Sequence, residues 1–127
     1  MIQGIGTDIV AVERIRQATE RWGEKFLHRI YTASEISHCQ TMQNPSPCLA
    51  KRFAAKEALV KALGTGMRDG IWFTDIQVSN NASGKPSIKL HGTACRYLEA
   101  MGGGTIHLSL SDDDGRAMAF VVIEKTE

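Results

Sequence analysis

Residues 48–63 read CLAKRFAAKEALVKAL, which is the strongest helical pattern in the chain. The run Asn44–Pro47 before it and Gly64 after it bound this pattern, because proline favours the first turn of a helix and glycine favours the residue just past its end. At about 100° per residue, its large apolar residues share one face. That face is made of Leu49, Phe53, Val60 and Leu63. The pattern predicts a helix over Cys48–Leu63 that packs this face against the rest of the protein.

Three charged side chains of this helix are candidates for chemistry. Glu57 stands at the edge of the apolar face, one turn before Lys61, and the two could form an ordinary helix pair worth about 0.2–0.5 kcal/mol. The alternative interpretation is that both side chains face a charged ligand. Lys56 projects from within the apolar face, where a lysine is costly unless its ammonium reaches water or an anion. Spacing within the helix leaves both interpretations of Glu57 and Lys61 open.

Asp8 is the candidate upstream of this helix. Residues 2–7 predict a short strand with two glycines, and residues 10–22 predict a helix that Gly23 ends. An aspartate between them is either the N-cap of that helix or a carboxylate that faces a ligand. If Asp8 meets Glu57 in space, the two carboxylates suit Mg²⁺ and a phosphorylated substrate, because Mg²⁺ takes one or two carboxylates, keeps waters and binds phosphate oxygens. Their separation in the sequence does not show whether they meet.

The second half of the chain has the alternating pattern of β-hairpins. The expected strands cover residues 76–79, 87–90, 105–111 and 117–124, with turns at 80–84 and 112–115. Residues 93–101 predict one more helix, and a capping box at Thr32 and Glu35 predicts another that runs to about Met42. Helices gathered early and hairpins late indicate the α+β class, with helices packed on a small antiparallel sheet.

Length and composition indicate one globular domain over residues 1–127. Hydrophobic residues make up 43% and charged residues 23% of the chain, which excludes a disordered or low-complexity protein. No apolar run approaches the roughly 18 residues of a membrane span, and residues 1–10 lack the basic and apolar regions of a signal peptide. The three cysteines are odd in number and have no Cys-x-x-Cys spacing, so they predict reduced thiols rather than a disulfide or zinc framework. We therefore expect a cytoplasmic protein that does not associate with membranes.

Charge is distributed unevenly along the chain. Residues 1–68 carry 10 Lys and Arg against 6 Asp and Glu, whereas residues 69–127 carry 5 against 8. A local basic region on a chain of net charge +1 indicates one anionic ligand rather than general nucleic-acid binding. Arg14 and Arg21 lie within about 20° of each other on the first predicted helix. They form either a solvated face or a docking surface for an acidic protein.

Two blocks of sequence, in this order and separation, resemble the holo-acyl-carrier-protein synthase family, the short type of 4′-phosphopantetheinyl transferase. The first is GIGTDIV at residues 4–10, followed by Arg14. The second is KRFAAKEA at residues 51–58, followed by Lys61 and by GTG at residues 64–66. The resemblance extends nearly end to end through GKP at 84–86, HLS at 107–109 and the closing strand that ends VIE at 122–124. The chain departs from the pattern at Asp112, where many relatives have a histidine.

The resemblance implies the 4′-phosphopantetheinyl transferase fold and transfer of 4′-phosphopantetheine from coenzyme A to a serine of apo acyl carrier protein. Adenosine 3′,5′-bisphosphate would be released, as a step that serves fatty acid biosynthesis. Asp8 and Glu57 would hold Mg²⁺, and Lys61 would neutralise charge on the pyrophosphate. The implied contacts of coenzyme A are Arg52, Phe53, Lys61, Lys85 and His107. Arg14 and Arg21 would meet the acidic helix of the carrier protein, and the family implies a homotrimer with sites between subunits.

Two other function classes use the same residues. A Mg²⁺-dependent phosphohydrolase or nucleotide-binding enzyme would release phosphate from nucleotides without a protein acceptor. A non-catalytic module for an acidic protein would bind its partner regardless of Mg²⁺ and coenzyme A. The two motif blocks, the chain length and the basic helix face together favour the transferase.

Overall fold

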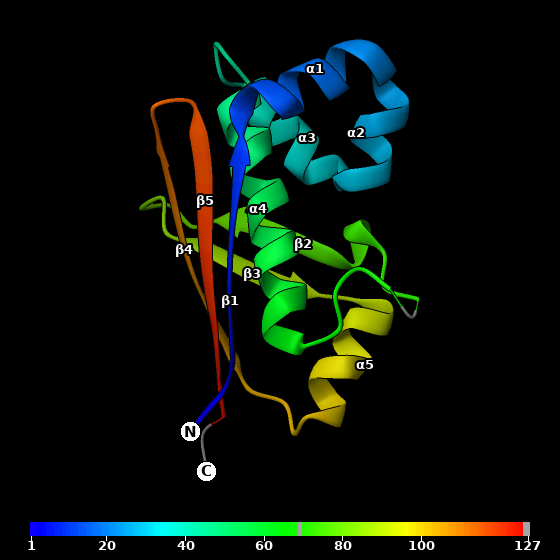
Figure 1. The fold of residues 1–127 in the computed structure, drawn as a ribbon, viewed down its shortest axis with the longest axis vertical. Helices are drawn as coiled ribbons and strands as arrows, with labels where there is room; N and C mark the ends of the chain where they lie inside the picture. Colours follow the sequence, from blue (N-terminus) through cyan, green and yellow to red (C-terminus); the bar gives the residue numbers. More distant parts are fainter. Residues whose placement is uncertain (69, 126–127) are drawn as a thin grey trace.

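The structure, a computed structural model, describes residues 1–68 and 70–125. Its helices are α1 (Val12–Trp22), α2 (Glu24–Ile30), α3 (Ala33–Gln40), α4 (Ser46–Leu63) and α5 (Gly92–Ala100). Its strands are β1 (Ile2–Ala11), β2 (Ile76–Asn80), β3 (Pro86–Leu90), β4 (Thr105–Asp113) and β5 (Arg116–Glu124), with a short 3-10 helix, Phe73–Asp75, before β2. β1, β5 and β4 form one antiparallel sheet in that order, and β2 pairs with β3 in a second (Figure 1). The predicted α+β class is confirmed, with two antiparallel sheets in place of one.

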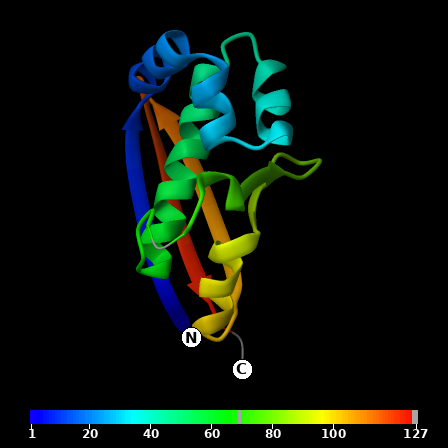
Figure 2. The ribbon, with the colours of Figure 1, turned by 90° about the vertical axis from the view of Figure 1, so that its right-hand side faces the viewer.

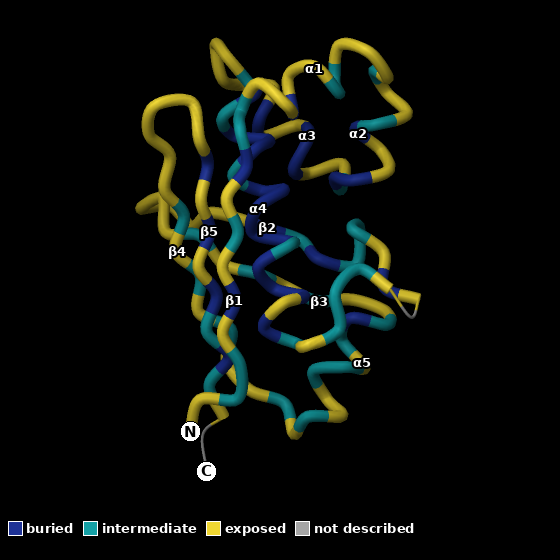
Figure 3. Tube along the Cα trace, in the orientation of Figure 1, coloured by how far each residue is buried: buried dark blue, intermediate teal, exposed yellow. Residues whose placement is uncertain are grey.

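Helix α4 is the centre of the fold. It runs along the sheet β1-β5-β4, with α1, α2 and α3 gathered at one end of the molecule and α5 towards the other (Figures 1 and 2). Thirteen residues of α4 are buried, so the predicted single apolar face is too narrow (Figure 3). The burial is wider than predicted because α4 has a second buried face, which is made of small side chains and not of large apolar ones. This face is made of Ala50, Ala54, Ala58 and Ala62.

The backbone of β1 packs directly onto this alanine face. A Cβ atom added at Gly4 would lie 2.0 Å from the carbonyl oxygen of Ala62, and one added at Gly6 would lie 1.9 Å from that of Ala58. Only glycine allows a strand to approach a helix backbone so closely. Because alternate residues of a strand point to the same side, the next residue on this face of β1 is Asp8. The two glycines therefore bring Asp8 to the side of α4.

Strand β1 is longer than the prediction, and this changes the position of Asp8. The strand continues to Ala11, which pairs with Arg116, because β5 is long enough to supply partners along its whole length. Asp8 pairs with Ala119 in the middle of this ladder. Helix α1 begins only at Val12, and its N-cap residue, Ala11, makes no side-chain cap. The interpretation of Asp8 as a helix N-cap is therefore wrong.

The region between α1 and α4 differs most from the prediction. The capping box of Thr32 and Glu35 is confirmed, but helix α2 is not among the predicted elements. Cys39 and Cys48 form a disulfide with their Cα atoms 5.5 Å apart, so the prediction of three free thiols is wrong for these two and holds for Cys95. The two cysteines come within the range of a disulfide because the chain between α3 and α4 turns back on itself and sets the two helices side by side.

The sheet β1-β5-β4 has two unlike faces. One packs on α4 and contains side chains such as Val10, Ala119 and Val121. The opposite face carries large apolar side chains that no other element of residues 1–68 and 70–125 covers, namely Ile5, Ile9, Met118 and Phe120, which are 61%, 58%, 43% and 43% exposed. An apolar face of this kind marks an interaction surface. Among the described residues, no helix has both the length and the apolar character needed to cross a bilayer.

Candidate functional site

The predicted residues Asp8 and Lys61 form an ion pair. Lys61 Nζ lies 3.1 Å from Asp8 Oδ1 and also donates a hydrogen bond of 2.9 Å to the carbonyl oxygen of Thr7. The Asp8 side chain is 18% exposed and that of Lys61 is 52% exposed. Lys61 thus reaches from α4 across to β1 instead of along its own helix. The interpretation of Glu57 and Lys61 as an ordinary helix pair is wrong, because Glu57 has no salt bridge to any cation in the described parts of the chain.

Glu57 lies within electrostatic range of this pair. Burial raises the pKa of its carboxyl group above the ordinary value, and the negative charge of Asp8 raises the pKa further. The cations Lys61 and Arg14 oppose this shift with smaller effects. The structure therefore places Asp8 near enough for its charge to act on Glu57, which their positions in the sequence could not establish. Two carboxylates that repel each other at a half-buried site create a place where a cation is stabilised.

The donor set limits which cation these residues could hold. In residues 1–68 and 70–125 no group of three or more His, Cys, Asp and Glu side chains is arranged around a common point. A structural zinc site, with its four protein ligands, does not fit such a place. Mg²⁺ does fit, because it is bound through one or two carboxylates and completes its shell with water and substrate phosphate. Asp8 and Glu57 are the two carboxylates available.

Aromatic packing joins α1 to this site. The guanidinium of Arg14 lies 5.6 Å from the centroid of the Phe53 ring, and Phe53 stacks on Phe73 with centroids 5.7 Å apart. Arg14 therefore stands at the edge of the carboxylate site. Arg21 lies further along α1, exposed, with its guanidinium 4.9 Å from the Trp22 ring centroid. The two arginines line one exposed side of α1, and one end of that side adjoins the site.

Arg52 lies on the other side of α4. It is nine positions before Lys61, which is about 180° around a helix. Its side chain is 3% exposed, and its Nη2 donates a hydrogen bond of 2.6 Å to Asn80 Oδ1. Its Nη1 donates to Cys48 Sγ at 3.3 Å, and its Nε has no hydrogen-bond partner among the described residues. Burial lowers the pKa of this guanidinium, and the negative charge of Glu35 opposes the shift.

Arg52 opens onto a cavity of about 510 Å³. The cavity lies between the start of α4, the end of α3 and the β2–β3 turn, and its lining includes His38, Met42, Lys51, Asn80 and Pro86. Lys51 forms an ion pair of 3.1 Å with Asp112 at the end of β4. Lys85 stands in the turn between Gly84 and Pro86, which both line the cavity. Two predicted ligand contacts, Arg52 and Lys85, thus lie at or next to one basic cavity.

His107 faces away from both the carboxylate site and the basic cavity. It pairs with Val122 and points to the exposed side of the sheet, where its Nε2 lies 3.0 Å from Glu124 Oε1. The residues predicted to bind coenzyme A therefore do not converge within one chain. Lys61 and Phe53 lie at the carboxylate site, Arg52 and Lys85 at the cavity, and His107 on the outer sheet face.

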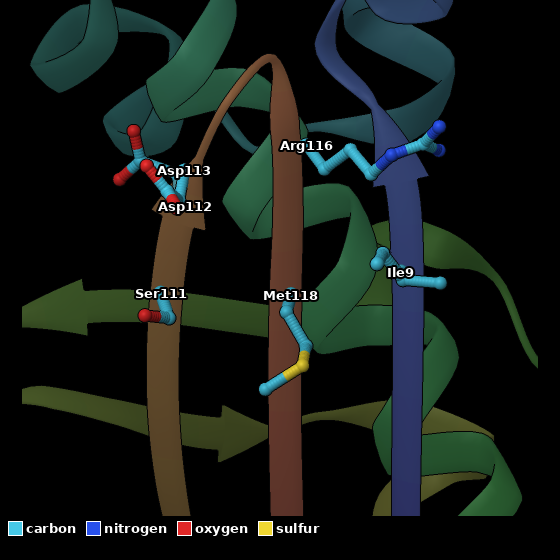
Figure 4. Close-up of a pocket in the computed structure, with 6 residues that line it drawn as sticks. All are labelled: Ile9, Ser111, Asp112, Asp113, Arg116 and Met118. Carbon is cyan, nitrogen blue, oxygen red and sulfur yellow. The ribbon is translucent and has the colours of Figure 1, made fainter.

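The outer sheet face is an exposed apolar surface whose residues the sequence analysis did not single out. Figure 4 shows Ile9 of β1, Met118 of β5 and Ser111 of β4 side by side across the sheet, where they line a shallow pocket of about 200 Å³. A second pocket of about 280 Å³ is lined by Phe120 of this face and by Lys61. The apolar face and the ion pair of Lys61 are therefore continuous. The sequence does contain a signal for this surface, because β1 and β5 carry apolar residues on both of their faces. A sheet with one face in water would carry fewer apolar residues on that face.

Taken together, a central helix with a carboxylate pair, a lysine and a basic cavity defines a small α+β enzyme that handles a phosphorylated substrate. The family model described as the 4′-phosphopantetheinyl transferase superfamily matches residues 4–120. The chain belongs to this superfamily, as its two motif blocks predicted.

Individual relatives agree over nearly the whole length. The holo-[acyl-carrier-protein] synthase of Halothermothrix orenii is 48% identical over 125 residues, which cover 98% of this chain and 99% of the relative. The crystal structure of the synthase from Neisseria meningitidis has a TM-score of 0.89 and 44% identity, covering 98% of this chain and 100% of that one. The synthase from Helicobacter pylori, solved in complex with coenzyme A, has a TM-score of 0.84 and 35% identity, covering 94% of this chain and 99% of that one.

Proposed function

We propose that this chain transfers the 4′-phosphopantetheine group of coenzyme A to a serine hydroxyl of apo acyl carrier protein, releasing adenosine 3′,5′-bisphosphate. The single observation that carries the proposal is the ion pair of Lys61 and Asp8 beside Glu57, in a chain similar to holo-[acyl-carrier-protein] synthases over nearly its whole length. The reaction serves fatty acid biosynthesis, and we place it in the cytoplasm, in a single domain over residues 1–127.

In this proposal Asp8 and Glu57 hold Mg²⁺. When bound, Mg²⁺ neutralises the pyrophosphate and makes the phosphorus more electrophilic. Lys61 adds a fixed positive charge at the same place, where it stabilises the charge that develops on the leaving phosphate. The nucleophile is the serine of the carrier protein, so this chain positions the reactants and neutralises charge, and it need not supply a nucleophile of its own.

The separation of the predicted coenzyme A contacts supports a site built from two copies of the chain. Lys61 and Phe53 of one copy would face the pyrophosphate, and the basic cavity with Arg52 and Lys85 of another copy would hold the rest of coenzyme A. The outer sheet face, which carries His107, supports this arrangement because it is apolar, exposed and continuous with Lys61. We propose a homotrimer in which this face is buried between subunits.

Arg14 and Arg21 are the proposed contacts of the carrier protein. Both are exposed on α1, and Arg14 stands beside the carboxylate site, so a partner docked along α1 could present its serine there. Complementary charge of this kind raises the association rate and makes it sensitive to salt.

Intact-protein mass spectrometry of apo acyl carrier protein tests the proposal. The carrier is incubated with this chain, coenzyme A and Mg²⁺, beside a sample with EDTA and a sample without this chain. The expected result is a Mg²⁺-dependent gain of one phosphopantetheine group on the carrier. An unmodified carrier together with phosphate release from coenzyme A would replace the transferase with a phosphohydrolase.

A further inference from the structure

The disulfide between Cys39 and Cys48 stands at the wall of the large cavity. It joins the end of α3 to the start of α4. The side chain of Cys39 is fully buried, whereas Cys48 is 7% exposed and lines the cavity. Of the two cysteines, Cys48 is therefore the one that borders the cavity. The proposed transferase reaction uses neither sulfur.

Arg52 is placed to stabilise a negative charge on Cys48. Its Nη1 lies 3.3 Å from Cys48 Sγ. Arg52 is 3% exposed, yet no carboxylate of the described residues forms a salt bridge with it, and its Nε is unpartnered. The negative charge of Glu35 acts on Arg52 from beyond salt-bridge distance, and a buried cation without a counter-ion in direct contact is costly. A thiolate on reduced Cys48 would be a counter-ion in direct contact with Arg52, which the disulfide does not supply.

Other groups around Cys48 also favour a thiolate. Cys48 is the third residue of α4, which begins at Ser46, and the first turn of a helix stabilises negative charge. The remaining titratable side chains on the cavity wall are His38 and Lys51, and both are basic. Lys51 is already paired with Asp112. Thiolates stabilised by arginine and by a helix N-terminus are the reactive cysteines of proteins.

We propose that Cys39 and Cys48 form a reversible dithiol–disulfide couple in which Cys48 is the reactive sulfur and Cys39 is the resolving one. A hydroperoxide oxidises the Cys48 thiolate to a sulfenic acid: the O–O bond breaks, one oxygen bonds to sulfur, and the other leaves as water or an alcohol after taking a proton. The Cys39 thiol then attacks this sulfur, the S–S bond forms, and water leaves. A dithiol reverses the change by attacking Cys48 Sγ, which expels Cys39 as a thiol, and its second thiol then releases Cys48.

The couple would regulate the charge of the cavity. In the reduced protein the Cys48 thiolate neutralises Arg52, and in the disulfide the Arg52 charge is available to an anion in the cavity. Disulfides of cytoplasmic proteins are usually transient and redox-sensing, which fits a reversible couple. This consequence rests on the proposed function, in which Arg52 binds coenzyme A, whereas the thiol chemistry does not.

Thiol chemistry of the full chain tests the couple directly. The Cys95→Ser variant removes the free thiol on α5 and leaves only the pair. The reduced variant is treated with hydrogen peroxide, and its thiols are counted by maleimide labelling and peptide mapping. Loss of both thiols, a linked peptide of Cys39 and Cys48, and full recovery with dithiothreitol are expected. Two thiols that persist under these conditions would overturn the proposal.

Single-cysteine variants test which sulfur reacts first. Both single-cysteine variants also carry Cys95→Ser. In the Cys39→Ser variant, dimedone should trap a sulfenic acid on Cys48. Cys48 in this variant should also react with iodoacetamide at pH 7 about tenfold faster than Cys39 does in the Cys48→Ser variant. Equal rates, or faster reaction of Cys39, would contradict the assignment. The result of the disulfide experiment holds even if one of the single-cysteine variants is unstable.

Arg52 variants test the cause of the reactivity. Arg52→Gln should slow alkylation of Cys48 at pH 7 by about tenfold, whereas Arg52→Lys should retain most of the rate. Lys51→Gln is the matched control, since it removes a neighbouring charge that does not contact Cys48. A rate that falls equally in Lys51→Gln would overturn the role of Arg52. Thermal unfolding of each variant, monitored by circular dichroism, identifies those that are folded.

Coenzyme A binding to the reduced and oxidised Cys95→Ser protein, measured by calorimetry without carrier protein, tests the link to function. Tighter binding by the oxidised form is expected. Equal binding by both forms would show that the disulfide does not regulate the cavity, and it would leave the reversible dithiol–disulfide couple unaffected. Absence of binding by either form would count against the proposed function and not against the couple.

Discussion

Lys56 Nζ lies 2.7 Å from Glu35 Oε1, and neither side chain is exposed to solvent. The ammonium also donates hydrogen bonds to the carbonyl oxygens of Ile30 and Phe73, and Glu35 Oε2 accepts one from the backbone of Val78. This network joins α2, α3 and β2 to α4 around the side chain of Lys56. It explains why a lysine is tolerated inside an apolar helix face: the predicted anion is Glu35. Burial lowers the pKa of Lys56, and the negative charge of Glu35 opposes that shift.

The first prediction concerns this buried pair. Lys56→Met should lower the free energy of unfolding by about 3–5 kcal/mol, because it leaves the Glu35 carboxylate buried without its cation. The measurement is urea denaturation followed by circular dichroism. Lys89→Met, at an exposed position of β3, is the control and should change stability by less than about 0.5 kcal/mol. If the two variants were equally stable, the pair would have no structural role.

The second prediction separates stability from activity at Glu57. The pKa of this carboxyl is raised in the folded protein, so the folded state binds more protons than the unfolded state above the ordinary pKa of 4.5. The stability from this group is present below that value and is lost as the pH rises through the raised pKa. At pH 7, Glu57→Gln should therefore be more stable than the parent in the absence of Mg²⁺, and inactive in transfer. Melting temperatures of both proteins between pH 4 and pH 7 test this, and a difference that shrinks as the pH rises would contradict it.

The third prediction concerns the ion pair of Lys61 and Asp8. Lys61→Ala should lower kcat by about 100-fold and change coenzyme A affinity much less, since its charge is proposed to act in the transition state. Asp8→Asn keeps the shape of the side chain and should abolish Mg²⁺-dependent transfer. Steady-state kinetics with apo acyl carrier protein, together with calorimetry for coenzyme A, provide the readout. An equal loss of binding and turnover in Lys61→Ala would assign it to substrate binding alone.

The fourth prediction concerns the basic side of α1. Arg21 is the cleaner test because, unlike Arg14, it does not contact Phe53 beside the carboxylates. Arg21→Glu should raise the KM for carrier protein about tenfold and reduce its salt dependence, with the KM for coenzyme A unchanged. Arg96→Glu on α5 is the matched charge reversal at an exposed site. If both variants behaved alike, net charge rather than a docking surface would be the cause.

The fifth prediction concerns the outer sheet face. Phe120→Asp places a charge in the apolar face that we propose is buried between subunits. The variant should sediment as a monomer in analytical ultracentrifugation and should lose transfer activity, because the site would lack the residues of the neighbouring copy. Ser79→Asp, at an exposed position of β2, is the control. A parent protein that sediments as a monomer would reject the trimer.

Local features of the sequence were sufficient for the class of fold and for the family. The caps around α4, the Thr32 and Glu35 box and the alternation of the two hairpins depend on interactions within a few residues, and their patterns are visible in the chain. The two motif blocks carry the family for the same reason, because each is a continuous run of residues. The carboxylates and the lysine of the candidate site were predicted in this way.

What the tertiary structure decided is how residues far apart in the chain meet. The approach of Gly4 and Gly6 to the α4 backbone pairs Asp8 with Lys61 and not with a helix N-terminus. The same packing leaves one sheet face uncovered and brings Cys39 to Cys48. None of these follows from spacing, because contacts between distant residues depend on which backbones can approach one another, and a missing Cβ or a turn in the chain decides that in three dimensions.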